Sequence, residues 1–147
     1  MPDLPSDTNP LPSNQHETHT EDQHRRLALQ IVTMPRDTNQ YGTIFGGVIL
    51  SFIDQAGFVE ARRYGIHRWV TASLDRVDFK APVHLGDIVS FYTRTSRLGS
   101  KSVTVLVEVE AERYESQDHV AVTSATITLV AVDAQGHPIP FRQPKSV

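Results

Sequence analysis

Residues 47–65, GVILSFIDQAGFVEARRYG, constrain the fold most, because they form a long run with the character of a single helix. The run contains no proline, spaces its apolar residues three and four positions apart, and closes on two arginines, a tyrosine and a glycine. This pattern predicts one helix of about eighteen residues that stops at Gly65. A helix with an apolar face needs a second layer to cover that face.

The remaining residues from Leu27 onward have the composition of β-strands. Residues 27–35, LALQIVTMP, alternate well enough for a strand that stops at Pro35. Four later segments are rich in β-branched residues and are separated by turn signals, namely 69–83, 87–99, 101–115 and 119–134. The alternation is clearest in 101–115, where we expect one face to be buried and the other partly solvated; the buried face carries Val103, Val105, Val107 and Val109.

The element order is therefore strand, long helix and four strands. It predicts an α+β fold in which one long helix lies across an antiparallel sheet of five to six strands. We place this domain at residues 25–137, with a short C-terminal tail at 138–147. Residues 1–24 are rich in Pro, Ser, Asp, Asn and Thr, so we expect a disordered tail, in which His16, His19 and His24 have no scaffold that would fix a metal site.

Composition excludes several functions. The 147 residues contain no cysteine and carry a net charge of −3, which rules out disulfide and thiolate chemistry and gives no basic field for nucleic acid or an anionic membrane. The longest apolar runs are far too short to span a bilayer, and the N-terminus lacks the order of a signal peptide. We expect a cytoplasmic protein that needs no metal or redox cofactor.

Asp54 is the unusual residue of the predicted helix. On a period of 3.6 residues it falls in a stripe with Leu50, Gly57 and Ala61, so we expect it to lie inside the apolar sector. An unpaired ionised carboxylate in that sector would lower the free energy of unfolding by several kcal/mol. Two interpretations stay open from the residues alone: a structural partner or solvent at the helix edge satisfies Asp54, or it borders a cleft and acts as a base or nucleophile.

The residues before the helix add to this ambiguity. Gly46 and Gly47 either make the tight turn into the helix or leave its first amides open as an oxyanion site. Asn39 either binds the local backbone or orients a water molecule or a carbonyl group. Gly57 lowers helix propensity by about 1 kcal/mol, which favours a close approach of another backbone or a ligand.

Taken together, these residues resemble the motif P-x-D-x-N-x-x-G-x-x-F-G-G-x-x-L-x-x-x-D-x-x-G of the hotdog-fold acyl-CoA thioesterases, the bacterial acyl-CoA hydrolases and their tandem-domain animal relatives. The resemblance spans about residues 27–133. The matching positions are Pro35, Asp37, Asn39, Gly42, Phe45, Gly46, Gly47, Leu50, Asp54 and Gly57, followed by Phe79, Pro82, Gly86 and Asp87.

The resemblance implies the hotdog fold and hydrolysis of acyl-CoA to a free acid and coenzyme A. It implies dimers that assemble further, into tetramers or hexamers, with active sites between two subunits. By the same resemblance Asp54 activates water or attacks the thioester, Asn39 of the partner chain positions water and substrate, and the Gly47 amide region holds the thioester oxygen.

The surface that binds coenzyme A is assigned from charge and from the helix start. Lysine and arginine beside a glycine turn either bind exposed phosphates or are ordinary solvated charges. The candidate substrate-binding residues are Phe45, Gly46, Lys80, Arg97, Ser100, Lys101 and Ser102. His67 and His84 have the character of loop residues at strand ends.

Two alternatives to hydrolysis stay open. One is a hotdog dehydratase or hydratase, although such enzymes rely on a histidine that the helix region does not supply. The other is a sensor that binds acyl-CoA without cleaving it. The sequence does not reveal the length of the acyl chain.

Overall fold

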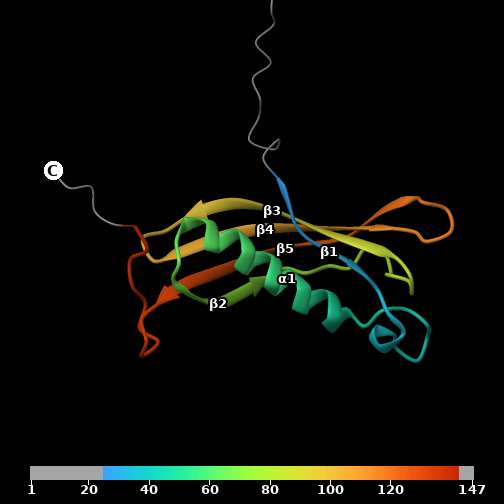
Figure 1. Ribbon diagram of the computed structural model, residues 1–147, viewed down its shortest axis with the longest axis horizontal. Coiled ribbons are helices and arrows are strands. Elements are labelled where there is room, and N and C mark those ends of the chain that lie inside the picture. Colours follow the sequence, from blue (N-terminus) through green and yellow to red (C-terminus); the bar gives the residue numbers. More distant parts are fainter. Residues whose placement is uncertain (1–24, 143–147) are drawn as a thin grey trace, which may run out of the picture.

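The structure is a computed structural model that describes residues 25–142; residues 1–24, including the three predicted tail histidines, and residues 143–147 lie outside it (Figure 1). Five antiparallel strands form one sheet in the order β1-β3-β4-β5-β2, and one helix lies across it. The elements are β1 (Arg26–Val32), η2 (Pro35–Asp37), α1 (Gly46–Ala61), η3 (Arg62–Tyr64), β2 (Arg68–Asp75), β3 (Ile88–Leu98), β4 (Ser102–Glu112) and β5 (His119–Val132). This arrangement confirms the predicted α+β architecture.

The core lies between α1 and the sheet. In β4 every second residue is buried, and Val103, Val105, Val107 and Val109 are at most 1% exposed, as the alternation predicts. Ile49 and Ile53 of the helix pack into the same core. Gly57 allows the close approach, because a Cβ atom at this position would lie 2.7 Å from Cγ2 of Ile127. The helix therefore packs directly on β5 at Gly57. The close approach predicted at this glycine is made by the sheet.

The second strand is shorter than predicted. We expected one strand over residues 69–83, but β2 ends at Asp75, and residues 76–87 form an irregular connection. Arg76 has a φ of 49°, a left-handed conformation that ends the extended pairing with β5. The apolar residues after Arg76 therefore line a loop that reaches back to the start of α1.

The C-terminal segment is more ordered than the predicted tail. Phe141 is buried, and its ring packs against Trp69 at a centroid distance of 5.3 Å. Its amide donates to the carbonyl of Ser100. The packed unit therefore extends beyond residue 137 at least to Phe141, because this aromatic ring covers an end of the core that a tail would leave open.

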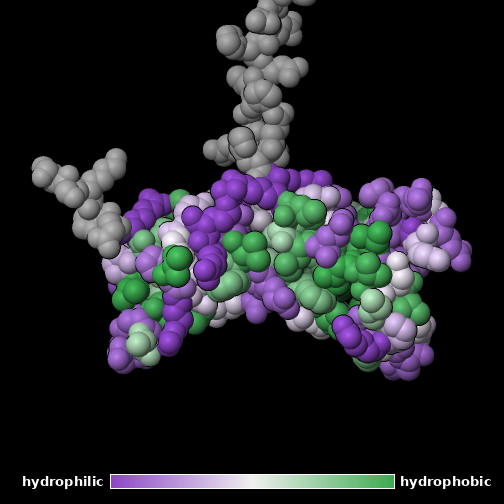
Figure 2. All heavy atoms as spheres, viewed as in Figure 1, coloured by the Kyte–Doolittle hydropathy of each residue, from purple (hydrophilic) through white to green (hydrophobic). Residues whose placement is uncertain are grey.

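The surface of the described residues is mixed. Figure 2 shows hydrophobic side chains exposed over the N-terminal half of α1, next to hydrophilic ones. No helix in residues 25–142 has the length and hydropathy that crossing a membrane would require.

Candidate active site

Asp54 lies on the exposed side of α1, so the expectation that it points into the apolar sector is wrong. The buried face of the helix consists of Ile49, Ile53, Ala56, Gly57, Glu60 and Ala61. Successive helix residues are about 100° apart, so Asp54, which follows the fully buried Ile53, is turned toward the rim of the sheet. There its Oδ1 accepts a hydrogen bond from the hydroxyl of Thr71.

Thr71 belongs to a strand with an open edge. β2 is an edge strand, and seven of its eight residues are exposed. Its register shifts between Thr71 and Ser73, so a β-bulge lies directly beside the Asp54 contact. Bulges re-aim side chains next to functional sites. Asp54 is thus an accessible carboxylate, oriented by a hydroxyl group, at a free edge of the sheet.

The buried acid of the helix is Glu60, which the sequence reasoning missed. It is 4% exposed, and its two carboxylate oxygens accept hydrogen bonds from Thr93 and Thr95, both at 3.0 Å. Arg63 approaches the same carboxylate at 3.5 Å. The spacing of the sequence did indicate this burial. Glu60 follows Ala56 by four positions and Gly57 by three, so it lies on the same face of the helix as these two residues.

The start of α1 is open. Phe45 occupies the N-cap position without a side-chain cap, and a Cβ atom at Gly47 would have no neighbour within 4 Å. Within residues 25–142, the amides of Gly46 and Gly47 form no hydrogen bond. These are the amides that an α-helix leaves without a partner, and they favour a negatively charged oxygen.

A mostly apolar cavity of about 410 Å³ lies beside this helix start. Its lining includes Gly46, Ile49, Phe79 and Lys80, and the Phe79 ring would lie 3.5 Å from a Cβ atom at Gly46. Two predicted substrate-binding residues, Gly46 and Lys80, therefore line the same cavity, together with apolar surface that suits a hydrophobic chain.

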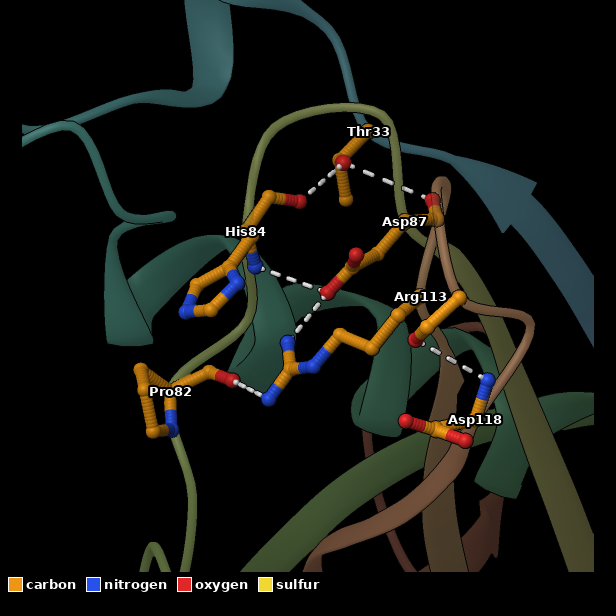
Figure 3. A network of polar contacts seen from close by, with 7 residues as sticks. Thr33, Pro82, His84, Asp87, Arg113 and Asp118 are labelled. Carbon is orange, nitrogen blue, oxygen red and sulfur yellow. Dashed lines mark hydrogen bonds and ion pairs between the residues drawn. The ribbon is translucent and has the colours of Figure 1, made fainter.

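The loop at residues 82–87, which contacts the start of the helix, is held by a polar network around Asp87 (Figure 3). The carbonyl of Val83 accepts a hydrogen bond from the Ile44 amide at 2.9 Å, so residues 82–87 support the segment that leads into α1. Asp87 is 1% exposed, and its Oδ2 accepts from Arg113 at 2.6 Å and from the His84 amide at 2.8 Å. Arg113 also donates to the carbonyl of Pro82 at 2.9 Å. The ion pair between Asp87 and Arg113 therefore holds the loop of residues 82–87 at both of its ends.

Asn39 organises the turn that precedes the helix. Its Oδ1 accepts hydrogen bonds from the amides of Tyr41 and Thr43, and its Nδ2 donates to the Thr43 hydroxyl at 2.8 Å. Within the single chain, the local backbone interpretation of Asn39 is therefore the one observed. The second Nδ2 hydrogen is not used by these contacts.

The other predicted substrate-binding residues are distributed over separate places. Phe45 is 49% exposed at the helix start. Arg97 lines a second cavity, near the C-terminal end of α1. Ser100 and Lys101 lie at the turn between β3 and β4, where their carbonyls accept from the amides of Phe141 and Ala131, and Ser102 is the first residue of β4.

The two loop histidines, His67 and His84, make structural contacts. Nε2 of His67 lies 3.1 Å from the carbonyl of Phe141, and its ring packs edge-on against Trp69. His84 contributes its backbone to the network around Asp87, while its side chain is exposed. Residues 25–142 contain no group of three or more His, Asp or Glu side chains that could hold a metal ion.

Comparison with known proteins places this chain in a family. Residues 41–115 match the model of the thioesterase superfamily. The acyl-CoA thioester hydrolase YciA of Escherichia coli is 36% identical over 115 residues, which are 76% of this chain and 87% of that protein.

Two solved structures share the fold. A hexameric hotdog-fold thioesterase of Campylobacter jejuni is 48% identical, with a TM-score of 0.73 over 78% of this chain and 88% of that one. A hexameric broad-specificity acyl-coenzyme A thioesterase is 34% identical, with a TM-score of 0.76 over 81% and 82%. The family match, the relatives and the shared architecture agree, and the chain belongs to the hotdog-fold thioesterase superfamily.

Proposed function

We propose that this protein hydrolyses acyl-CoA thioesters to a carboxylic acid and coenzyme A, as a homo-oligomer. The observation that carries the proposal is the position of Asp54, an exposed carboxylate held by Thr71 at the free edge of the sheet. The relatives support the substrate class, since they are named acyl-CoA thioester hydrolases. Hexameric relatives favour a hexamer over the tetramer that the family resemblance also allows.

In the proposed reaction Asp54 acts on the thioester carbonyl carbon. As a general base it takes a proton from a water molecule whose oxygen attacks that carbon; as a nucleophile it attacks directly and water later hydrolyses the anhydride. In both routes the carbon–sulfur bond breaks, and the thiolate of coenzyme A leaves and takes up a proton. The amides at the start of a helix stabilise the negative charge on the carbonyl oxygen, as an oxyanion hole does.

Helix geometry supports a site that two chains share. Gly47 and Asp54 are seven residues apart on α1, a rise of about 10 Å. A base and an oxyanion donor must both lie within about 3 Å of groups on one thioester. One helix therefore does not supply both, so we assign Asp54 to one subunit and the Gly47 amide to its partner, with Asn39 beside that amide. The exposed edge of β2 is where a second copy would bring them together.

The test is Asp54→Asn, assayed by thiol release from a panel of acyl-CoAs. We expect the oligomer and the fold to persist while kcat falls by about a hundredfold or more, the scale of acid–base catalysis. Asp118→Asn is the matched control, because Asp118 is an exposed carboxylate in the connection between β4 and β5, outside the strand that carries Thr71.

Three outcomes would contradict the proposal. Turnover of Asp54→Asn at the rate of the natural protein excludes Asp54 from the chemistry. A change in enoyl absorbance without thiol release indicates hydratase activity. Stabilisation by acyl-CoA with neither signal indicates a sensor.

A further inference from the structure

The cavity of about 410 Å³ beside the start of α1 has a fixed side and a side that can change. Its fixed side consists of Ile44, Ile49 and Val83, which are at most 6% exposed and belong to the hydrophobic core. Its other side includes Phe79, which is 46% exposed. The cavity is therefore closed toward the core, whereas an aromatic ring outside the core borders it toward solvent.

The backbone on both sides of Phe79 is bound to β5. The Asp78 carbonyl accepts a hydrogen bond from the Thr123 hydroxyl at 2.8 Å, and the Lys80 amide donates to the Val122 carbonyl at 2.8 Å. Neither contact uses the Phe79 side chain. A substitution at Phe79 therefore changes the wall of the cavity, while the contacts that hold its backbone persist.

The Phe79 ring lies next to the proposed oxyanion site. A Cβ atom at Gly46 would lie 3.5 Å from two carbons of this ring, so the glycine keeps the space between helix and ring open. Consecutive Cα atoms are about 3.8 Å apart, so a chain attached to a carbonyl group at the Gly47 amide reaches the cavity that Gly46 lines. Two chains are attached to a thioester carbonyl, the acyl chain and the pantetheine arm of coenzyme A.

The chemistry of the lining favours the acyl chain. The Ile44 amide donates to the Val83 carbonyl, and the Pro82 carbonyl accepts from Arg113 (Figure 3). The Lys80 amide is used by its contact to β5, and proline has no amide hydrogen. Pantetheine carries two amide groups that need hydrogen-bond partners when they leave water, whereas an aliphatic chain needs none.

We propose that this cavity holds the acyl chain of an acyl-CoA, and that the Phe79 ring sets the longest chain that fits. The identity of the ligand rests on the hydrolysis proposed above. Each methylene group that enters the cavity leaves water and strengthens binding. Since the core side does not yield, this gain ends at the length where the chain meets the Phe79 ring.

S-alkyl-CoA thioethers of increasing chain length are the probes, titrated calorimetrically into the full chain. They have no thioester carbonyl, so binding is measured without hydrolysis. We expect the affinity of the natural protein to rise by about fourfold per methylene group and to level off at a limiting length. In Phe79→Ala the limit should move to longer chains, and in Phe79→Leu it should move less.

Tyr114→Ala is the matched control, because this aromatic residue is 77% exposed and does not line the cavity. It should keep the limiting length of the natural protein. Phe79→Leu retains a large apolar side chain, so it keeps the test valid if Phe79→Ala impairs folding. In thiol-release assays with the matching acyl-CoAs, the chain length of highest kcat/KM should move with the limit measured by binding.

The proposal is overturned if no thioether binds, if affinity does not depend on chain length, or if the Phe79 variants keep the limit of the natural protein. A change in affinity that is equal at every chain length would also overturn it and would assign the cavity to the pantetheine arm. A limit that moves in Phe79→Ala without thiol release from any acyl-CoA would contradict the hydrolysis proposal alone.

Discussion

Replacing Arg113 with methionine tests the buried ion pair that holds the loop under the start of α1. The substitution keeps much of the side-chain length but removes the 2.6 Å contact to Asp87, a carboxylate that is 1% exposed. Asp87 then keeps only the His84 amide, and Pro82 loses its donor. Removing one partner of a buried ion pair costs about 3–5 kcal/mol, because the other charge stays buried without compensation.

This loss corresponds to a fall in melting temperature on the order of 10 °C, measured at fixed protein concentration because oligomerisation also affects it. The decisive comparison is the double variant Asp87→Asn with Arg113→Met. Asparagine still accepts from the His84 amide but carries no charge, so the double variant should be more stable than Arg113→Met alone. A loss below about 1 kcal/mol for Arg113→Met, or a double variant that is less stable than it, would refute the reasoning.

Two further substitutions test the helix contacts. Gly57→Ala should lower the free energy of unfolding by about 1–3 kcal/mol in thermal or urea unfolding, because the new Cβ would lie 2.7 Å from Ile127. Gly47→Ala is the control, because its Cβ would have open space, and it should be neutral or stabilising. Equal effects of the two substitutions would contradict the close approach at Gly57. Thr71→Val should leave the fold intact but lower kcat for thiol release, because Asp54 loses its hydrogen-bond donor. Thr71→Ser keeps a hydroxyl group and should restore the rate. A fully active valine variant would show that Thr71 has no role in the site.

Much of the fold could be predicted because local patterns repeat over many residues. The valines of β4 alternate with polar residues, and a strand can bury such a pattern in only one way. The helical run also stops at Gly65 as predicted, although α1 itself ends at Ala61 and the last turn is the 3-10 helix η3. Gly65 has a φ of 142°, and a Cβ atom there would lie 2.8 Å from the His67 ring, so glycine is required where the chain turns into β2.

Exceptions arose where distant contacts decide the outcome. The end of β2 depends on the single residue Arg76, whose left-handed backbone has no signature in a segment rich in valine and phenylalanine. The burial of Phe141 depends on its packing against Trp69, some seventy residues earlier. Neither the backbone conformation of Arg76 nor the packing of Phe141 has a periodicity that a sequence pattern could reveal.

The sequence by itself determined the element types and the chemical groups at the candidate site, because periodicity, glycine positions and the family motif are local properties. Only the tertiary structure decided which helix acid is buried. A helix with apolar residues around most of its circumference can rest on several faces, and the contact of Gly57 with Ile127 selects the rotation that buries Glu60 and exposes Asp54. The order of strands then places Thr71 at the sheet edge beside Asp54.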